Sequence, residues 1–120
     1  MRLSIVLCAV AALLCSGAAC AEDKPIDKAT GQDVVEWCSD HNDTPLRQRC
    51  WALLGLQLWV LSQANAQEQT TGVKYCTPSK NMLETAQDDV TAWLKKHPEA
   101  NSRPASDAIS DATMALYKCH

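Results

Sequence analysis

Four stretches of the chain place apolar residues at helical spacing, and the first of them is short. Val34 and Cys38 are four residues apart and therefore share one face of a helix. Thr30 precedes this stretch as a candidate N-cap, and Asp33 occupies the position of the acidic partner in a capping box. The pattern predicts a short helix that begins at residue 31 or 32 and fades near residues 39–40.

The second stretch is the most apolar one. Thr44, or Asp43, is the expected N-cap, and Pro45 fits the first helical turn. Between Trp51 and Leu61 the chain is apolar nearly all round, which predicts a helix buried on most sides. Burying a helix on every side is difficult in a small protein, so part of this surface is expected to face a second subunit. Core packing is the preferred interpretation for each tryptophan. The core or dimer residues are Trp51, Leu54, Leu58 and Trp59.

A polar segment separates these helices from two more. Residues 63–71 are polar and lack apolar periodicity, and we interpret residues 65–74 as a frayed helix end plus an exposed loop. Thr77-Pro78 predicts the start of a third helix, Pro98 its end, and Pro104 the start of a fourth helix that runs to Cys119. The stripe of the third helix consists of Met82, Leu83, Ala86, Val90, Trp93, Leu94 and His97. No stretch alternates as a strand would, so we predict an all-α, single-domain bundle of about four helices.

The N-terminus has the three parts of a secretory signal peptide. Arg2 supplies positive charge, residues 3–14 are almost wholly apolar, and Ala19-Cys20-Ala21 offers a small-x-small cleavage site. Cleavage after Ala21 leaves a domain over residues 22–120 that opens with a flexible leader as far as Ala29. A retained membrane helix is the alternative, but the apolar run is shorter than the roughly 20 residues that a span needs. A lipoprotein modified at Cys20 is disfavoured by the small Gly17. We therefore predict a periplasmic protein that is free of the membrane.

Charge excludes one class of partner. The whole chain has a net charge of −3, and loss of Arg2 with the signal peptide makes the remainder slightly more acidic. No basic patch interleaved with aromatic residues is present, so nucleic acid is not an expected partner.

Cysteine counting predicts two disulfides. Of the seven cysteines, four lie beyond the signal peptide, and an even number in a short exported domain indicates disulfide bonds. Cys38 and Cys50 flank the loop between the first two helices. Cys76 precedes the third helix and Cys119 ends the fourth, so the two meet if these helices are antiparallel. We predict the pairs Cys38–Cys50 and Cys76–Cys119. A metal site that uses His41 with these cysteines is the alternative, but no paired Cys-x-x-Cys spacing supports it, and no cofactor is expected.

Candidate catalytic residues do not assemble into a known arrangement. Ser39, Asp40 and His41 are adjacent in sequence, which a polar loop explains better than a triad does. Asp88 and Asp89 are helical neighbours that point in different directions. The sequence contains no glycine-rich phosphate loop and no His-Glu-x-x-His motif. Binding is therefore the expected activity, and the protein is not expected to be an enzyme.

Several segments together resemble one family. Residues 31–38 look like a Gly-x-x-aliphatic-aliphatic-x-x-Cys opening, and Tyr75-Cys76-Thr77-Pro78 looks like an aromatic-Cys-x-Pro element. Residues 90–99 (VTAWLKKHPE), then Arg103-Pro104-Ala105 and a helix ending at Cys119, complete the pattern. The chain thus resembles the Rap/Tai immunity proteins of type VI secretion from Thr30 to Cys119. It departs after Cys50, where Ala52 and Leu56 replace two family glycines, which is expected to alter helix packing or dimer geometry.

The resemblance implies a periplasmic, often dimeric protein that blocks a cognate peptidoglycan amidase by covering its active-site groove. A rigid, disulfide-linked scaffold would lower the entropic cost of such docking. The polar segment 67–74 is the candidate protrusion, with an ordinary solvated connection as the competing interpretation. Its candidate contact residues are Gln67, Glu68, Gln69, Thr70, Thr71 and Lys74. A small acid-responsive periplasmic chaperone is the alternative function, although His97 is the only histidine in an apolar stripe.

Overall fold

The computed structural model describes residues 24–42 and 44–119. The predicted signal peptide, residues 1–21, lies outside the described residues, so its removal and the boundary at residue 22 stay predictions. The elements are η1 (Ile26–Lys28), α3 (Gly31–Cys38), α4 (Pro45–Ala66), α5 (Glu68–Thr71), α6 (Met82–Lys96), η2 (Pro98–Ala100) and α7 (Ala105–Tyr117). Apart from helices, the described part of the chain contains two isolated β-bridges, Thr30 with Pro104 and Tyr75 with Lys118. The prediction of a small all-α bundle is confirmed.

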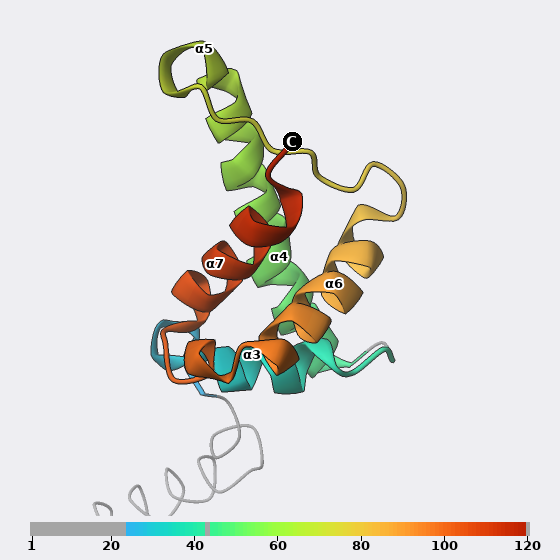
Figure 1. Cartoon of the computed structure of the whole chain (residues 1–120). Helices are drawn as coiled ribbons and strands as arrows, with labels where there is room; N and C mark the ends of the chain where they lie inside the picture. The colour runs from blue at the N-terminus through green and yellow to red at the C-terminus, as the bar shows by residue number, and fades with distance from the viewer. Residues whose placement is uncertain (1–23, 43, 120) are drawn as a thin grey trace, which may run out of the picture.

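The four main helices enclose one core. Each of α3, α4, α6 and α7 contacts the other three. Helix α3 lies across one end of the bundle, and α4 rises past the others to carry α5 at the opposite end (Figure 1). The side chains with at most 1% exposure include Val34, Leu54, Val90, Leu94 and Ile109, contributed by all four helices. No helix among the described residues is long and apolar enough to cross a membrane.

Local capping explains where the first two helices begin. The backbone N–H of Thr30 donates to Asp33 Oδ2 at 2.9 Å, so the predicted capping-box contact is present at the start of α3. The Thr44 hydroxyl accepts from the Arg47 N–H at 3.3 Å, and Pro45 opens α4. Both predicted starts are confirmed.

Glycine at position 31 is a packing requirement. A Cβ added there would lie 2.3 Å from the backbone oxygen of Ala100 and 3.0 Å from the Cβ of Ala108. Only a residue without a side chain lets α3 approach η2 and α7 this closely.

The predicted start of the third helix is wrong. Helix α6 begins at Met82, and Asn81 before it has a left-handed backbone with φ of 47°. Tyr75 is bridged to Lys118, which keeps the chain extended beyond the polar segment. Residues 77–81 then make the turn into α6, so Pro78 lies in a loop. The fourth helix also ends earlier than predicted, at Tyr117, because Lys118 belongs to this bridge.

The described part of the predicted leader is ordered against the bundle. Ala29 is 2% exposed, and its carbonyl accepts the Ala105 N–H at 2.8 Å. Lys24 forms a 2.9 Å ion pair with Asp33. The prediction of a flexible leader is therefore wrong from Lys24 onwards, because Lys24 pairs with Asp33 of α3 and Ala29 bonds to the first residue of α7.

Both predicted disulfides are confirmed. Cys38–Cys50 and Cys76–Cys119 each join Cα atoms 5.1 Å apart. The first links the end of α3 to the first turns of α4, and the second links the segment before α6 to the segment after α7. Disulfides are typical of proteins that work in oxidising compartments.

Candidate functional site

The segment predicted to protrude forms the far end of the molecule. Helix α4 continues to Ala66, and a single helical turn, α5, follows it. Gly72 ends that turn with a left-handed φ of 71°. We call residues 67–74 the tip; Figure 1 shows it at the top of α4, on the side away from α3. The predicted frayed end is wrong, since residues 65–66 belong to α4, whereas the predicted exposed loop is indeed exposed but begins with one helical turn.

The tip exposes nearly all of its side chains. All six candidate contact residues are exposed, and Val73 is half-buried against the core cluster. The turn is held by its own backbone, since the N–H groups of Thr70 and Thr71 donate to the Gln67 carbonyl at 2.9 and 3.0 Å. Amide and hydroxyl groups dominate this surface, with one acid, Glu68, and one base, Lys74. Such a surface offers hydrogen bonds without a strong charge.

A short backbone ladder holds the base of the tip. The Cys76 N–H donates to the Tyr117 carbonyl at 2.6 Å, and the Cys119 N–H donates to the Lys74 carbonyl at 3.0 Å. On the other side, Asn65 of α4 donates to the Tyr75 carbonyl at 2.8 Å and accepts the Tyr75 N–H at 2.7 Å. The chain leaving the tip is therefore clamped between α4 and the C-terminal segment. Sequence reasoning placed Asn65 in a frayed end and missed this role.

Helix α4 is less buried than predicted. Leu54 and Leu58 are 0% and 4% exposed, which confirms them as core residues. Trp51 is half-buried. Trp59 is 59% exposed, so the preferred interpretation of core packing is wrong for this residue. The other helices cover one side of α4 and leave an apolar stripe on the opposite side. This α4 stripe consists of Ala52, Leu56, Trp59 and Val60.

The two residues that the resemblance predicts to replace glycines, Ala52 and Leu56, both lie on the α4 stripe. Ala52 is exposed and Leu56 is 61% exposed. Their added bulk therefore points away from the core, apart from the small pocket that Leu56 shares with Ile109 of α7. The exposure of both residues favours an effect on what contacts the stripe over an effect on packing inside the bundle.

A buried glutamine that sequence reasoning missed ties three elements together. Gln87 of α6 is 0% exposed. Its Nε2 donates to the carbonyls of Cys38 and Asp40, each at 2.8 Å, and its Oε1 accepts from Trp51 Nε1 at 2.8 Å and from Arg47 Nε at 3.3 Å. The available signal was a long polar residue next to Ala86 and three positions before Val90, within the apolar stripe of α6.

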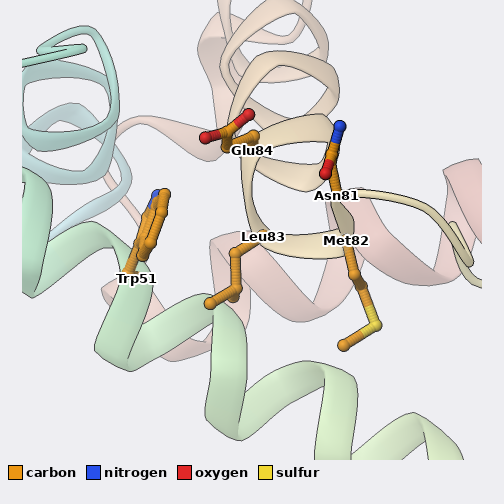
Figure 2. A pocket seen from close by; sticks show the side chains of 5 residues that line it. All are labelled: Trp51, Asn81, Met82, Leu83 and Glu84. Atoms are coloured by element: carbon orange, nitrogen blue, oxygen red, sulfur yellow. The ribbon is translucent and has the colours of Figure 1, made fainter.

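A pocket lies where α4 meets the start of α6. Trp51, Asn81, Met82, Leu83 and Glu84 line it (Figure 2). The Trp51 N–H is already bonded to Gln87, and the Arg47 guanidinium lies 4.4 Å from the Trp51 ring and 3.7 Å from the Glu84 carboxylate. The pocket therefore offers apolar contact and holds no nucleophile with a base.

The adjacent residues Ser39, Asp40 and His41, considered above as catalytic candidates, form hydrogen bonds that hold their own loop in place. Ser39 donates its hydroxyl to the Val35 carbonyl, and His41 Nε2 lies 2.7 Å from Asp88 Oδ1. A hydrogen bond from the Asn42 backbone, together with one from the Thr44 hydroxyl, lowers the pKa of Asp40. Ser39 and His41 are thus directed to different partners. Among the described residues, no group of three or more histidine, cysteine or acidic side chains is arranged to hold a metal.

The fold defines a class: a small all-helical protein linked by two disulfides. The chain matches the family model of the Rap1a immunity proteins over residues 30–119. It therefore belongs to the Rap1a immunity protein family, as the cysteine-bearing motifs suggested. Comparison with curated proteins and with solved structures finds no match. Immunity proteins act by binding a cognate toxin and are not enzymes, so the predicted activity class is confirmed.

Proposed function

We propose that this protein is a periplasmic immunity protein that inhibits a cognate peptidoglycan amidase delivered by type VI secretion. Membership of the Rap1a family supports an immunity function. The two disulfides support an oxidising compartment, and the predicted signal peptide supports export to the periplasm. No observation favours the alternative chaperone function over this one.

The protruding tip is the observation that carries this proposal. An inhibitor of an enzyme with a groove needs an element narrow enough to enter the groove and rigid enough to bind without a large loss of entropy. The tip consists of a single helical turn and the short segment that returns from it. Asn65 and the backbone ladder to residues 117–119 hold the chain where it leaves the tip. We propose that its amide and hydroxyl groups, above all those of Gln67, Gln69, Thr70 and Thr71, contact the groove of the amidase.

Two matched glutamine variants test the site. Gln69→Arg places a long charged side chain on the tip, whereas Gln32→Arg places the same side chain on exposed α3 at the other end of the molecule. We expect Gln69→Arg to weaken binding of the cognate amidase, sought among the products of the neighbouring genes, by about 100-fold, the effect of a central interface residue. Gln32→Arg should leave binding unchanged. Calorimetric titration measures both variants, and protection of cells that express the amidase in the periplasm provides the second readout.

The possible outcomes distinguish an error in the proposed function from an error in the proposed binding surface. If the wild-type chain neither binds the amidase nor protects cells from lysis, the immunity proposal fails. If the wild type binds and the two arginine variants weaken binding equally, or not at all, the amidase is bound through a surface other than the tip.

We further propose that the protein forms a homodimer and that the α4 stripe is its interface. Leu56, Trp59 and Val60 are 61%, 59% and 42% exposed, and large apolar side chains grouped on one helix face are typical of protein interfaces. Trp59→Ala should shift the mass measured by light scattering from dimer to monomer while stability changes by less than about 0.5 kcal/mol. Met82→Ala, at an exposed apolar residue on a different helix, is the matched control. A wild-type protein that is monomeric at high micromolar concentration would exclude the dimer.

A further inference from the structure

The two disulfides differ in their exposure to solvent. Cys38 and Cys50 are both 0% exposed and belong to the core cluster. Cys76 is exposed, and Cys119 is half-buried. Cleavage of a disulfide by a thiol requires a thiolate to reach one of the two sulfur atoms, so access decides which bond reacts first. The Cys76–Cys119 bond joins the more exposed pair of residues and is therefore expected to react first, whereas the Cys38–Cys50 bond is protected by the core.

The exposed disulfide lies at the base of the tip. It joins the two segments that form the ladder, residues 74–76 and 117–119. Helix α7 ends at Tyr117, so beyond that residue the C-terminal segment is held through the Tyr75–Lys118 bridge, the Cys119–Lys74 hydrogen bond and this disulfide. Without the disulfide, the C-terminal segment would be held to the base only by backbone hydrogen bonds between partly exposed residues, while Asn65 alone would hold Tyr75 on the α4 side, and such elements open readily.

We propose that Cys76–Cys119 is a redox-sensitive clasp that sets the affinity of the tip for the toxin. The inference rests on the proposed function, since it concerns regulation of the same surface. In the oxidised protein the clasp keeps the exit of the tip fixed. In the reduced protein the base opens, the tip samples more conformations, and binding must restore that order. The core, with Cys38–Cys50 intact, remains folded in both states.

The chemistry is thiol–disulfide exchange with a dithiol as reductant. One thiolate of the dithiol attacks Sγ of Cys76, the more exposed cysteine, and the bond between the two sulfur atoms breaks. Cys119 leaves as a thiolate and takes up a proton. The second thiol of the reductant then attacks the mixed disulfide, which releases Cys76 as a thiol and the reductant as its own disulfide. The net change is two electrons and two protons transferred from the dithiol to the clasp.

The order of reduction tests the clasp without any toxin. The oxidised full-length mature chain is treated with increasing dithiothreitol, free thiols are alkylated, and peptides are mapped by mass spectrometry. We expect Cys76 and Cys119 to be labelled while Cys38 and Cys50 remain joined and the helical circular dichroism is retained. Hydrogen exchange at the Tyr75, Cys76 and Cys119 amides should accelerate at least tenfold in that state. Opening of Cys38–Cys50 at the same or lower dithiothreitol, or unchanged exchange at the three amides, would overturn the proposal.

Affinity for the toxin is measured with a double variant, so that reductant never contacts the amidase. Cys76→Ala/Cys119→Ala should bind about tenfold more weakly than wild type, with a faster dissociation rate. Binding as tight as that of wild type would refute control of affinity by the clasp. If the oxidised wild type binds no amidase at all, the proposed function fails, and the reduction order and amide exchange still decide whether the clasp exists.

Discussion

The two ends of the bundle are held by different kinds of contact. At the α3 end, a fully buried disulfide lies beside Gln87, whose side chain reaches the chain on both sides of that disulfide. At the tip end, the disulfide includes an exposed cysteine, and backbone pairing supplies most of the other contacts. Buried contacts are lost together when the core unfolds, whereas exposed contacts can be lost locally. The α3 end therefore provides global stability, and the tip end provides a surface that can change without loss of the fold.

Removal of the buried disulfide should have the largest effect. Cys38→Ala/Cys50→Ala deletes a bond between two residues that are 0% exposed, so the protein loses packing as well as the constraint on its unfolded chain. We expect the free energy of unfolding to fall by about 4 kcal/mol, measured by urea denaturation. A fall below about 1 kcal/mol would show that this end does not carry the stability assigned to it.

Loss of the buried glutamine should come next. Gln87→Leu keeps a side chain of similar size but leaves the Asp40 carbonyl and the Trp51 N–H without this partner, and leaves the Cys38 carbonyl with the Thr91 hydroxyl alone. We expect a loss of about 3 kcal/mol, since each unsatisfied buried polar group is costly. Gln63→Leu, at an exposed position of α4, is the control and should be nearly neutral. Equal stability of the two variants would contradict the role given to Gln87.

Two glycine substitutions compare a crowded position with an open one. Gly31→Ala puts a Cβ 2.3 Å from a backbone oxygen, so α3 must shift, and we expect a loss of about 2 kcal/mol. At Gly55 of α4 the nearest atom to an added Cβ, Leu83 Cδ2, is 4.0 Å away. Gly55→Ala should therefore stabilise the protein by about 0.5 kcal/mol through helix propensity. The same sign for both variants in thermal denaturation would disagree with the packing described.

At the tip end, a single substitution should act locally. Asn65→Ala removes both hydrogen bonds to the Tyr75 backbone, with an expected global cost of about 1 kcal/mol. Hydrogen exchange at the Tyr75 amide should rise strongly, while amides in α3 keep their protection. Uniformly faster exchange in both regions would mean that the two ends are not independent.

The smallest expected effect on stability is the protonation of Asp33, the acidic residue that caps α3, at low pH. Partial burial opposes ionisation of Asp33, but Lys24 and the Thr30 N–H stabilise its carboxylate more, so the net pKa is lowered from 3.8. Because the folded pKa is the lower one, this stabilisation is present above pH 3.8 and is lost as the pH falls through the folded value. Asp33→Asn should lower the stability modestly at pH 7, where the stabilisation is fully present, and change little below the folded pKa, so the acid limb of the stability curve becomes flatter. If the acid limb of the Asp33→Asn variant is the same as that of the wild type, protonation of Asp33 does not contribute to the loss of stability at low pH.

Much of the framework followed from local rules. The starts of α3 and α4 were predicted because a cap such as Thr44 acts through its own first turn. The disulfide pairs were predicted because the order of helices leaves few antiparallel arrangements. Burial of Gln87 was not predictable in this way, since its partners come from α3, the following loop and α4. Trp59 was misplaced because a helix that is apolar all round has no periodicity to show which side is covered.

The sequence by itself determined the helical class, the cysteine framework and the family, because spacing, capping and motif order are properties of neighbouring residues. Only the tertiary structure decided which face of α4 remains exposed, where α6 begins and how the tip is held. These features depend on contacts between distant segments, such as Asn65 with Tyr75 and Tyr75 with Lys118. Such contacts form only once several helices have packed, so no local pattern records them.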